Sequence, residues 1–429
     1  MLLFLYNLLL LPALGLAFPI YLRRMLRRGG YRRNFVQRFG FYSRRLRARF
    51  PAHRWIWIRA VSVGEMVTAL RLVDALSRQD PGLNFLLSTT TSTGYQLGQD
   101  QANAAMTVVV YNPIDFWPVI TWVWSRIQPE RVVLIDSDLW PSFLARAHQR
   151  KTPVYLANAR LSLRSERRYR RTAWLAKRFF WQRITQVLAQ DEGDVPRWQS
   201  IGVPPERITV SGSIKFDIAE ANSTKNKHFF DLLHSAGIKT ERPIILGGSL
   251  HPGEEVLLLD TLPTIRAEFP DAFLILVPRH VERRPDIEKE IQSRGLRYTL
   301  RSQLDLTPDP EVLLIDSTGE LKDWYTLASV VVIGKSFTGT GGQNPVEALL
   351  AHKPVICGPH MENFAFLVNE LVRARALLQL HSAAALPSAL RQLLRDPTAT
   401  QRMITAADQV LAFHRGATAR TAEIVLGKR

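Results

Sequence analysis

The chain has 429 residues, with 56 lysines and arginines against 38 aspartates and glutamates, a net charge of +18, and 46% apolar residues. This length suits two or three domains that each bury a core, and the single cysteine, Cys357, excludes an internal disulfide framework. The basic excess favours a phosphate-bearing partner, such as nucleic acid, anionic lipid or a phosphorylated substrate.

The first segment of the chain is apolar. Residues 1–22 contain no charge, and residues 23–59 contain thirteen arginines and no acid. About 20 apolar residues can span a bilayer, and basic residues directly after them predict that the rest of the chain stays cytoplasmic. We therefore expect a membrane anchor over residues 1–22, with the arginines against anionic lipid. Asn7, Pro12 and Pro19 weaken a straight spanning helix and leave a shallow insertion open.

Past residue 50, short β-branched segments alternate with helical stretches, in two sets. The expected strands of the first set cover residues 55–60, 84–88, 107–111, 131–135, 153–157 and 186–189, and those of the second cover 243–246, 272–277, 312–315, 330–333 and 354–356. Such alternation predicts parallel sheets covered by helices on both faces. A polar stretch between the sets indicates a linker.

The expected domain organisation follows from these two sets. Residues 1–22 form the anchor, 23–216 an N-terminal Rossmann-like domain, 217–240 the linker, and 241–429 a C-terminal Rossmann-like domain. Whether the last helix returns to the N-terminal domain stays open.

Glu65 is the first acidic residue of the chain, and it follows the expected strand over residues 55–60. Ser62 and Gly64 come just before it, and an amphipathic helix pattern starts there. In open α/β sheets, substrates bind at the carboxyl ends of strands, so Glu65 is a candidate catalytic base. The helix N-terminus is expected to keep its carboxylate ionised. The alternative is a first-turn acid that only complements the helix dipole.

A glycine-rich loop follows the expected strand over residues 330–333. It contains Gly341 and Gly342 and leads through Gln343 and Asn344 into a helix that carries Glu347. Such a loop lets backbone N–H groups approach a phosphate, while a first-turn carboxylate can bind ribose hydroxyls. It matches neither the dinucleotide fingerprint nor a Walker loop. An ordinary strand–helix turn is the alternative.

Two further strand ends are expected in the same half of the molecule. Ser249 and His251 follow one strand, and Arg279 and His280 follow the next. Arg279 offers a permanent, planar positive charge for a phosphate. The two histidines are weaker candidates, because a histidine at a strand end is often only a hydrogen-bonded loop residue.

These segments together resemble those of the Kdo transferases, glycosyltransferase family 30, which attach 3-deoxy-D-manno-octulosonic acid (Kdo) to the lipid A precursor of Gram-negative bacteria. The resemblance extends from the apolar N-terminus nearly to the C-terminus. The segments that carry it are 62–65 (Ser-Val-Gly-Glu), 139–141 (Leu-Trp-Pro), 158–162 (Asn-Ala-Arg-Leu-Ser), 215–217 (Lys-Phe-Asp), 277–280 (Val-Pro-Arg-His), 341–347 (Gly-Gly-Gln-Asn-Pro-Val-Glu) and 358–360 (Gly-Pro-His).

The resemblance implies a GT-B fold, in which two doubly wound Rossmann-like domains face a central cleft. It implies metal-independent, inverting transfer of Kdo from CMP-Kdo to the lipid A precursor (lipid IVA) at the cytoplasmic face of the inner membrane, with no cofactor. Glu65 would be the general base, and Arg279 and Glu347 would hold the cytidine nucleotide. The remaining donor-side candidates are Ser249, His251, His280, Gly341, Gly342, Gln343 and Asn344, and the acceptor-side candidates are Ser62, Gly64, Asp136 and Asp138.

Two departures from the family pattern concern the site. Asp136 and Asp138 stand where the family usually carries glutamates, and Gln343 stands where it usually carries histidine. The shorter acids change the acceptor side by about one methylene, and Gln343 cannot supply a titrating ring. How many Kdo residues are added stays open.

Three alternatives remain. Asp136-Ser137-Asp138 also spells the D-x-D metal triad of the other major glycosyltransferase fold. A GT-B enzyme could instead use a UDP-sugar on a membrane lipid. A membrane-tethered basic protein without enzymatic activity is the third, although the sequence has no nucleic-acid-binding signature and we expect no nucleic acid partner.

Overall fold

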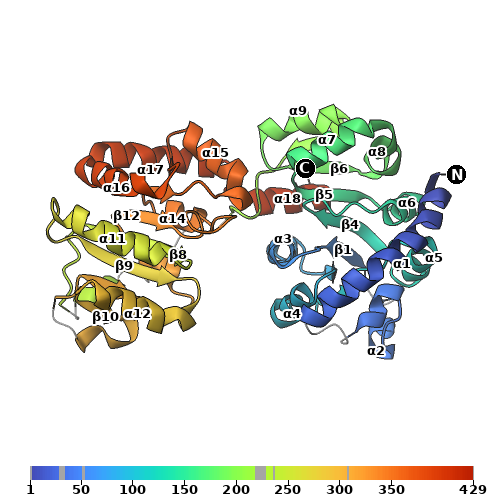
Figure 1. Cartoon of the computed structure of the whole chain (residues 1–429). Helices are drawn as coiled ribbons and strands as arrows, with labels where there is room; N and C mark the ends of the chain where they lie inside the picture. Colours follow the sequence, from blue (N-terminus) through green and yellow to red (C-terminus); the bar gives the residue numbers. More distant parts are fainter. Residues whose placement is uncertain are drawn as a thin grey trace. The chain divides into compact units, whose positions relative to one another are not determined.

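The computed structural model describes residues 2–28, 34–50, 54–217, 229–234, 237–306 and 309–428 (Figure 1). The chain divides into two compact units. The N-terminal unit comprises Met1–Asp217 and His414–Arg429, and the C-terminal unit comprises Ile218–Phe413. Each unit contains a seven-stranded sheet whose strand pairs are all parallel. The predicted α/β class with two parallel sheets is therefore confirmed.

The N-terminal sheet has the strand order β3-β2-β1-β4-β5-β6-β7. Its strands are β1 (Trp55–Arg59), β2 (Asn84–Thr89), β3 (Thr107–Tyr111), β4 (Pro129–Ile135), β5 (Val154–Ala159), β6 (Gln186–Ala189) and β7 (Ile208–Val210). The six strands expected in this half are present. The short β7 is an addition, and its three half-buried residues give too little apolar pattern to predict a strand.

The central strand β1 shows how the sheet builds its core. Trp55 and Trp57 point into one cluster of buried side chains, whereas Ile56 and Ile58 point into another. All four are at most 1% exposed. Because alternate residues of a strand face opposite sides, both faces of the sheet are buried under helices, as a parallel sheet requires.

The helices of the N-terminal unit follow the strands and cover the sheet. They are α1 (Leu2–Arg28), α2 (Arg44–Arg49), α3 (Val63–Gln79), α4 (Ser92–Gln101), α5 (Trp117–Arg126), α6 (Pro141–Gln149), α7 (Leu163–Arg171), α8 (Ala173–Phe179), α9 (Val195–Ser200) and α18 (Ala417–Leu426), with the 3₁₀ helices η1 (Phe35–Phe39), η3 (Trp181–Arg183), η4 (Glu192–Asp194) and η5 (Pro205–Arg207).

Helix α1 covers the apolar N-terminus and lies along the N-terminal unit next to α6 (Figure 1). Polar contacts fix it there. Tyr6 donates a hydrogen bond to Asp115, 3.0 Å away. The Asn7 amide donates to the Ser142 hydroxyl and accepts from the Trp117 backbone N–H. Among the described residues, no helix is both long enough and apolar enough to cross a membrane.

Helix α18, the last of the chain, packs against α3 in the N-terminal unit. Ala422 and Val425 of α18 share a buried cluster with Met66 of α3. The Asp217 carboxylate accepts from the Gly416 and Thr418 backbone N–H groups and so caps the start of α18. The structure thus returns the last helix to the first unit, the arrangement that the sequence left open, and places the boundary between the units after Asp217. Residues 218–228 of the expected linker lie outside the described part of the chain.

The C-terminal sheet repeats the plan, with the order β10-β11-β9-β8-β12-β13-β14. Its strands are β8 (Ile244–Leu250), β9 (Phe273–Pro278), β10 (Tyr298–Leu300), β11 (Val312–Leu314), β12 (Val330–Ile333), β13 (Val355–Cys357) and β14 (Leu378–Gln379). The five strands expected here are present. The edge strands β10 and β14 were missed, because they have only three and two residues.

The C-terminal unit contains the following helices: α11 (Glu254–Arg266), α12 (Arg284–Ser293), α13 (Leu321–Tyr325), α14 (Val346–Leu350), α15 (Ala365–Arg373), α16 (Leu386–Arg395) and α17 (Pro397–Ala412), with the 3₁₀ helices η6 (Val281–Arg283), η7 (Arg301–Leu306), η8 (Glu362–Phe364) and η9 (Ala383–Ala385). Leucines of α11 and α16 pack on the second sheet in one buried cluster.

Each sheet has one point at which its strand order reverses. In the N-terminal unit this switch point lies between β1 and β4, and in the C-terminal unit it lies between β8 and β12. In doubly wound sheets, ligands bind outside the carboxyl ends of the strands at such a point. The candidate site residues follow these strands.

Candidate active site

In the N-terminal unit, the candidate residues gather where β1 and β4 end. Ser62 and Glu65 lie at the junction of β1 with α3, and Asp136 and Asp138 lie between β4 and α6. Because β1 and β4 are paired neighbours, these two junctions are adjacent at the same edge of the sheet. The structure therefore brings the expected acceptor-side residues together around Glu65.

Ser62 caps the start of α3, and the Glu65 side chain reaches back to the residue before the cap. The Ser62 hydroxyl accepts from the Glu65 backbone N–H at 3.3 Å, while the Glu65 carboxylate accepts from the Val61 backbone N–H at 2.6 Å and from the Ser62 hydroxyl at 3.2 Å. The bond to the Ser62 hydroxyl satisfies one N–H group that a helix start leaves unpaired, and the bond from Val61 ties the carboxylate to the preceding turn. The helix-start role that sequence analysis held open is thus real, and it fixes the carboxylate in a half-buried position.

The environment of Glu65 raises its pKa above the ordinary value. Burial of the carboxyl group is the main cause, and the negative charges of Asp136 and Asp138 add to it, while the hydrogen bond from Val61 acts in the opposite direction. The expectation that the helix N-terminus would dominate and favour the ionised form is therefore wrong in direction. A carboxylate with a raised pKa is a stronger base than an ordinary glutamate.

Asp136 follows β4 with a backbone φ of 60°, a left-handed conformation that aspartate tolerates better than most residues. One carboxylate oxygen accepts from the Asn158 amide at 2.6 Å, and the other lies 2.6 Å from the Lys215 ammonium. Asn158 in turn accepts from the Ile214 backbone N–H. Asp136, which precedes the segment 139–141, thus contacts two of the recognised segments, namely 158–162 and 215–217.

Asp138 is buried and forms an ion pair with the equally buried Arg59, in which the Arg59 Nε atom lies 2.8 Å from Asp138 Oδ2. Trp140 donates its indole N–H to the other oxygen. The Arg59 guanidinium also stacks on the Phe143 ring, 4.2 Å from its centroid. Asp138 therefore orients Arg59 and Trp140. Asp136 and Asp138 pair with two different cations, which favours this reading over the D-x-D metal triad.

Gly64 lies exposed on the first turn of α3. A methyl group built there would have no neighbouring atom of the described residues within 4 Å. The fold itself therefore does not require glycine at this position, and the space beside Glu65 is open.

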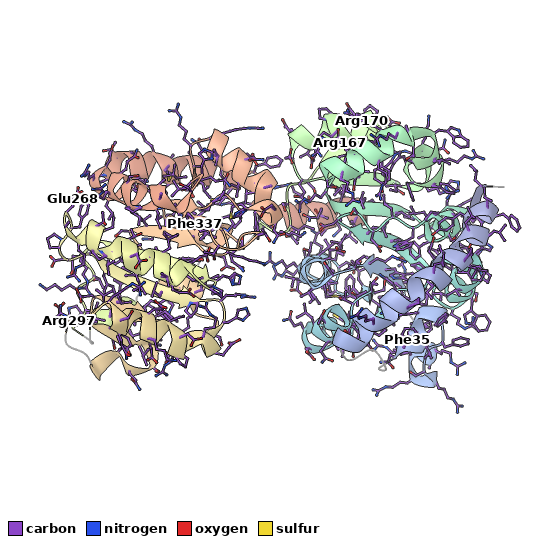
Figure 2. All side chains as sticks on the ribbon, in the orientation of Figure 1. Phe35, Arg167, Arg170, Glu268, Arg297 and Phe337 are labelled. Carbon is purple, nitrogen blue, oxygen red and sulfur yellow. The ribbon has the colours of Figure 1, made fainter. Side chains whose placement is uncertain are left out.

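In the C-terminal unit, a single buried carboxylate joins the loops that follow β8 and β12. Glu254, at 2% exposure, accepts from the backbone N–H groups of His251, Lys335, Ser336 and Phe337 at 2.6 to 3.0 Å. Phe337 is labelled in Figure 2. Glu254 is not among the site residues predicted from the sequence, because nothing local predicts contacts about 80 residues away. The carboxylate holds both loops in one arrangement.

The glycine-rich loop after β12 is shaped by close contacts. Gly341 and Gly342 have φ angles of 106° and 69°. A side chain on Gly341 would clash with Asn363, and one on Gly342 would clash with Met361. Glycine is therefore required at both positions.

The backbone N–H groups of this loop have partners within the protein. The Gly341 N–H donates to the Glu362 carboxylate, the Gly342 N–H to the Lys335 carbonyl, and the Gln343 N–H to the Gly334 carbonyl. The sequence-based expectation that these groups face a phosphate does not hold in this conformation, because the loop folds onto itself. The Asn344 side chain accepts from the Val346 N–H at the start of the five-residue helix α14.

Side chains at the ends of β8, β9 and β12 meet in this unit. The rings of His251 and His280 stack with centroids 5.9 Å apart, and the Gln343 amide nitrogen lies 3.3 Å from His251 Nε2. Burial lowers the pKa of His251, so the imidazole favours its neutral form. Ser249 is buried and has a left-handed φ of 54°. Gln343, which replaces a histidine of the family pattern, therefore keeps a polar contact to the neighbouring loop.

Arg279 follows β9, and its backbone N–H donates to the Leu250 carbonyl. Its side chain is exposed and has no ion pair with any residue that the structure describes. The guanidinium is thus available for an anion at the carboxyl edge of the sheet.

Glu347 is half-buried on α14. Burial of the Tyr325 hydroxyl, together with the negative charge of Glu347, raises the pKa of this tyrosine. A methyl group on Gly248 would lie 2.4 Å from that hydroxyl, so Tyr325 fills the space between β8 and Glu347. Sequence analysis missed Tyr325, since its position depends on the packing of α13 rather than on a motif.

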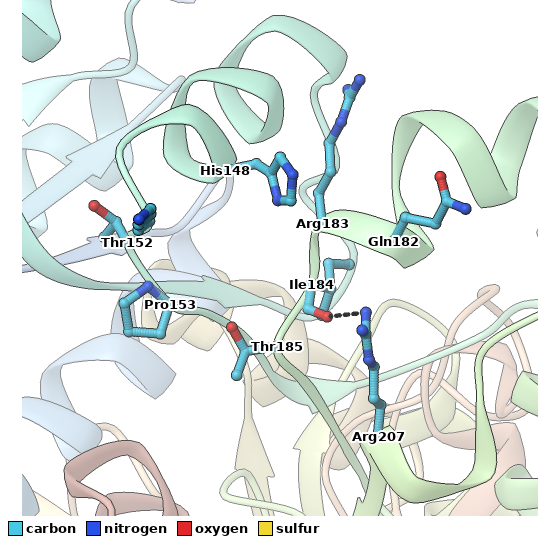
Figure 3. A pocket seen from close by; sticks show the side chains of 9 residues that line it. His148, Thr152, Pro153, Gln182, Arg183, Ile184, Thr185 and Arg207 are labelled. Carbon is cyan, nitrogen blue, oxygen red and sulfur yellow. Dashed lines mark hydrogen bonds between the residues drawn. The ribbon is translucent and has the colours of Figure 1, made fainter.

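A cavity of about 340 Å³ lies away from these residues, at the opposite edge of the N-terminal sheet (Figure 3). Pro153 and Thr185, which line it, come just before β5 and β6. The basic residues Arg183 and Arg207 in its wall donate to backbone carbonyls, including Arg207 to Ile184 at 3.2 Å. These bonds indicate a structural role.

Comparison with known proteins gives results for both sequence and fold. Residues 33–218 match the family described as 3-deoxy-D-manno-octulosonic-acid transferase (kdotransferase). The chain is 32% identical to the 3-deoxy-D-manno-octulosonic acid transferase of Haemophilus influenzae, over 92% of this chain and 91% of the relative. It is 35% identical to the protein of that name from Bordetella pertussis, over 95% of both chains.

Among solved structures, UDP-GlcNAc 2-epimerase from Neisseria meningitidis has a TM-score of 0.56 with 14% identity, covering 87% of this chain and all of that chain. This similarity concerns the fold alone. Together with the two parallel sheets, it defines a GT-B-like fold. The identity and coverage of the sequence relatives identify the family: the chain belongs to the Kdo transferases, which are glycosyltransferases.

Proposed function

We propose that the protein transfers Kdo from CMP-Kdo to the lipid A precursor, with inversion at the anomeric carbon. The observation that carries this proposal is the carboxylate of Glu65, fixed at the switch point of the N-terminal sheet with a raised pKa. Membership of the Kdo transferase family supports the choice of sugar.

Glu65 removes the proton of the attacking lipid hydroxyl in this mechanism. A positioned base contributes typically 10²–10⁴-fold to such a step. Burial and the charges of Asp136 and Asp138 make the carboxylate more basic, and the capping bonds hold it in place. Asp138 acts indirectly, through Arg59 and Trp140.

The C-terminal unit holds the donor. Arg279 supplies a side chain for the nucleotide phosphate, and Glu347 a carboxylate for the ribose hydroxyls. Ser249, His251, His280 and Gln343 surround the same strand ends. The negative charge that develops on the departing cytidine monophosphate is stabilised by Arg279.

We propose that α1 anchors the protein by shallow insertion at the cytoplasmic face of the inner membrane. The side of α1 that carries Tyr6 and Asn7 is held by the N-terminal unit. The other side exposes large apolar residues, namely Phe4, Leu5, Leu8, Leu9, Leu11, Leu14 and Leu16. An exposed apolar patch of this kind marks an interaction surface, and a helix with one polar, fixed side suits the bilayer interface.

A group of basic side chains on α7 suits anionic lipid and the acceptor phosphates. Arg164, Arg167, Arg168, Arg170 and Arg171 are exposed on α7, where Figure 2 shows Arg167 and Arg170. Glu166 pairs with Arg170 and Arg197, so part of this charge is compensated within the unit. Near a bilayer surface, each uncompensated basic residue contributes roughly 1 kcal/mol.

The proposal is tested by incubating the purified full chain with CMP-Kdo and the tetra-acylated lipid A precursor, followed by mass spectrometry of the lipid. Addition of Kdo is expected, and the mass gives the number of residues added. Competition by CMP but not UDP separates the proposed donor from a UDP-sugar. An unchanged lipid mass with CMP-Kdo, together with transfer from a UDP-sugar, would overturn the proposal.

A further inference from the structure

A cavity of about 440 Å³ lies at the carboxyl edge of the N-terminal sheet. Helix α1 and η1 form one wall, and the segments that follow β1, β2, β3 and β4 form the other. Its apolar lining consists chiefly of Leu10, Leu14, Phe35, Phe39, Ile114 and Trp140. Figure 2 shows Phe35 beside α1. The volume falls within the range of about 300–1,000 Å³ that is usual for small-ligand sites.

The cavity adjoins the candidate active site through buried polar residues. Arg59, which lines it, is paired with Asp138. Trp140, also in the lining, donates to the same carboxylate. The cavity and Glu65 therefore both lie at the carboxyl ends of β1 and β4.

The cavity also adjoins the exposed apolar side of α1. Leu10 and Leu14 face the cavity, while Leu9 and Leu11 on the same helix are more than half exposed. A hydrocarbon chain that leaves a bilayer beside α1 would pass from one apolar surface to the other without crossing a polar layer. This continuity favours a chain over a compact apolar ligand.

We propose that this cavity binds one acyl chain of the lipid acceptor, an inference that rests on the proposed transfer to a lipid. Two buried atoms in its wall, Arg59 Nη1 and Asn112 Oδ1, have no hydrogen-bond partner among the described residues. A carbonyl group on the chain would accept from Arg59, and a hydroxyl or amide would donate to Asn112. The bound chain holds the acceptor hydroxyl near Glu65.

The first test uses no donor and no variant. A tetra-acylated acceptor with a photoactivatable diazirine at the end of its acyl chains is irradiated with the full chain in detergent, and the labelled peptides are identified by mass spectrometry. Labels are expected within residues 10–15, 35–39 and 112–115. An excess of unlabelled acceptor should suppress them. Labels confined to the exposed side of α1 would overturn the proposal.

The second test uses two matched variants of α1. Leu10→Trp places an indole in the cavity, whereas Leu9→Trp places the same group on the exposed side. Leu10→Trp should raise KM for the tetra-acylated acceptor about tenfold or more, because the acyl chain loses its apolar contacts with the cavity. It should not change KM for a fully deacylated acceptor. Leu9→Trp should not raise the KM for the tetra-acylated acceptor relative to that for the deacylated acceptor.

The two tests separate this inference from the proposed function. If the unaltered protein transfers no Kdo, the proposed function fails. Labelling of the cavity still reports whether an acyl chain binds there. If Kdo is transferred but the cavity is not labelled and both tryptophan variants behave alike, the inference fails alone. Thermal melting checks that the Leu10→Trp variant is folded. If it is misfolded, the labelling experiment on the unaltered protein decides the question alone.

Discussion

Replacement of Glu65 by glutamine separates the two roles that the structure gives this residue. Glutamine has nearly the same shape, and its Oε1 atom can still accept from the Val61 N–H, so the start of α3 is kept. It cannot accept a proton from the lipid hydroxyl. Glu65→Gln should therefore lower kcat by about 10²–10⁴-fold, which corresponds to roughly 3–5 kcal/mol of transition-state stabilisation.

Stability should respond in a different way. Because burial and two neighbouring carboxylates raise the pKa of Glu65, ionising this group costs more free energy in the folded protein than in the unfolded chain. A neutral glutamine removes that penalty. The free energy of unfolding should stay within about 1 kcal/mol of the original value at pH 7, or rise.

Ser62→Ala is the matched control. It deletes the hydroxyl that accepts from the Glu65 N–H and keeps the carboxylate. Loss of an N-cap should cost about 0.5–2 kcal/mol of stability, with a much smaller effect on kcat than Glu65→Gln. The assays are Kdo transfer to the lipid acceptor and chemical unfolding. If Glu65→Gln kept most of the activity, or if both variants lost activity equally, Glu65 would be a capping residue only.

Three other substitutions test the surroundings. Asp136→Asn removes a charge that raises the pKa of Glu65, so the acid limb of the pH profile of kcat/KM should move to lower pH. If the acid limb does not move, a group other than Glu65 causes it. Gly64→Ala should raise the free energy of unfolding by roughly 0.5–1 kcal/mol, since alanine favours the helix. It should also raise KM for the acceptor. An unchanged KM would show that the substrate does not approach this turn. Gly334→Ala would bring a methyl group to 2.2 Å from the Ser249 carbonyl, so CMP binding measured by calorimetry should weaken about tenfold or more; equal binding would mean that the two loops do not form the donor site.

The sheets could be predicted from the sequence because their strands are continuous β-branched segments bounded by turns. The carboxyl-end positions of Glu65, Asp136 and Arg279 followed from the same pattern, since parallel strands place successive ends at one edge. Short edge strands such as β14 were not predictable, because two residues have no periodicity.

The contacts within the site could not be predicted, because they join residues far apart in the chain. The ion pair of Arg59 with Asp138 spans 79 positions, and the bonds of Glu254 to the loop after β12 span more than 80. The pKa of Glu65 shows a second limit. The helix field is visible in the sequence, whereas the burial that outweighs it depends on the whole unit.

The way in which α1 is held has a consequence for how the enzyme meets its substrate. A flexible linker between a membrane anchor and the catalytic domain would let the domain reorient above the bilayer and take many distances from it. The bonds of Tyr6 and Asn7 to residues 115–117 and to Ser142 allow no such freedom, because they make the helix part of the domain. If α1 inserts into the bilayer as proposed, the depth of insertion fixes the height of the Glu65 carboxylate above the membrane. An acceptor whose headgroup is too short or too long would then not reach this carboxylate.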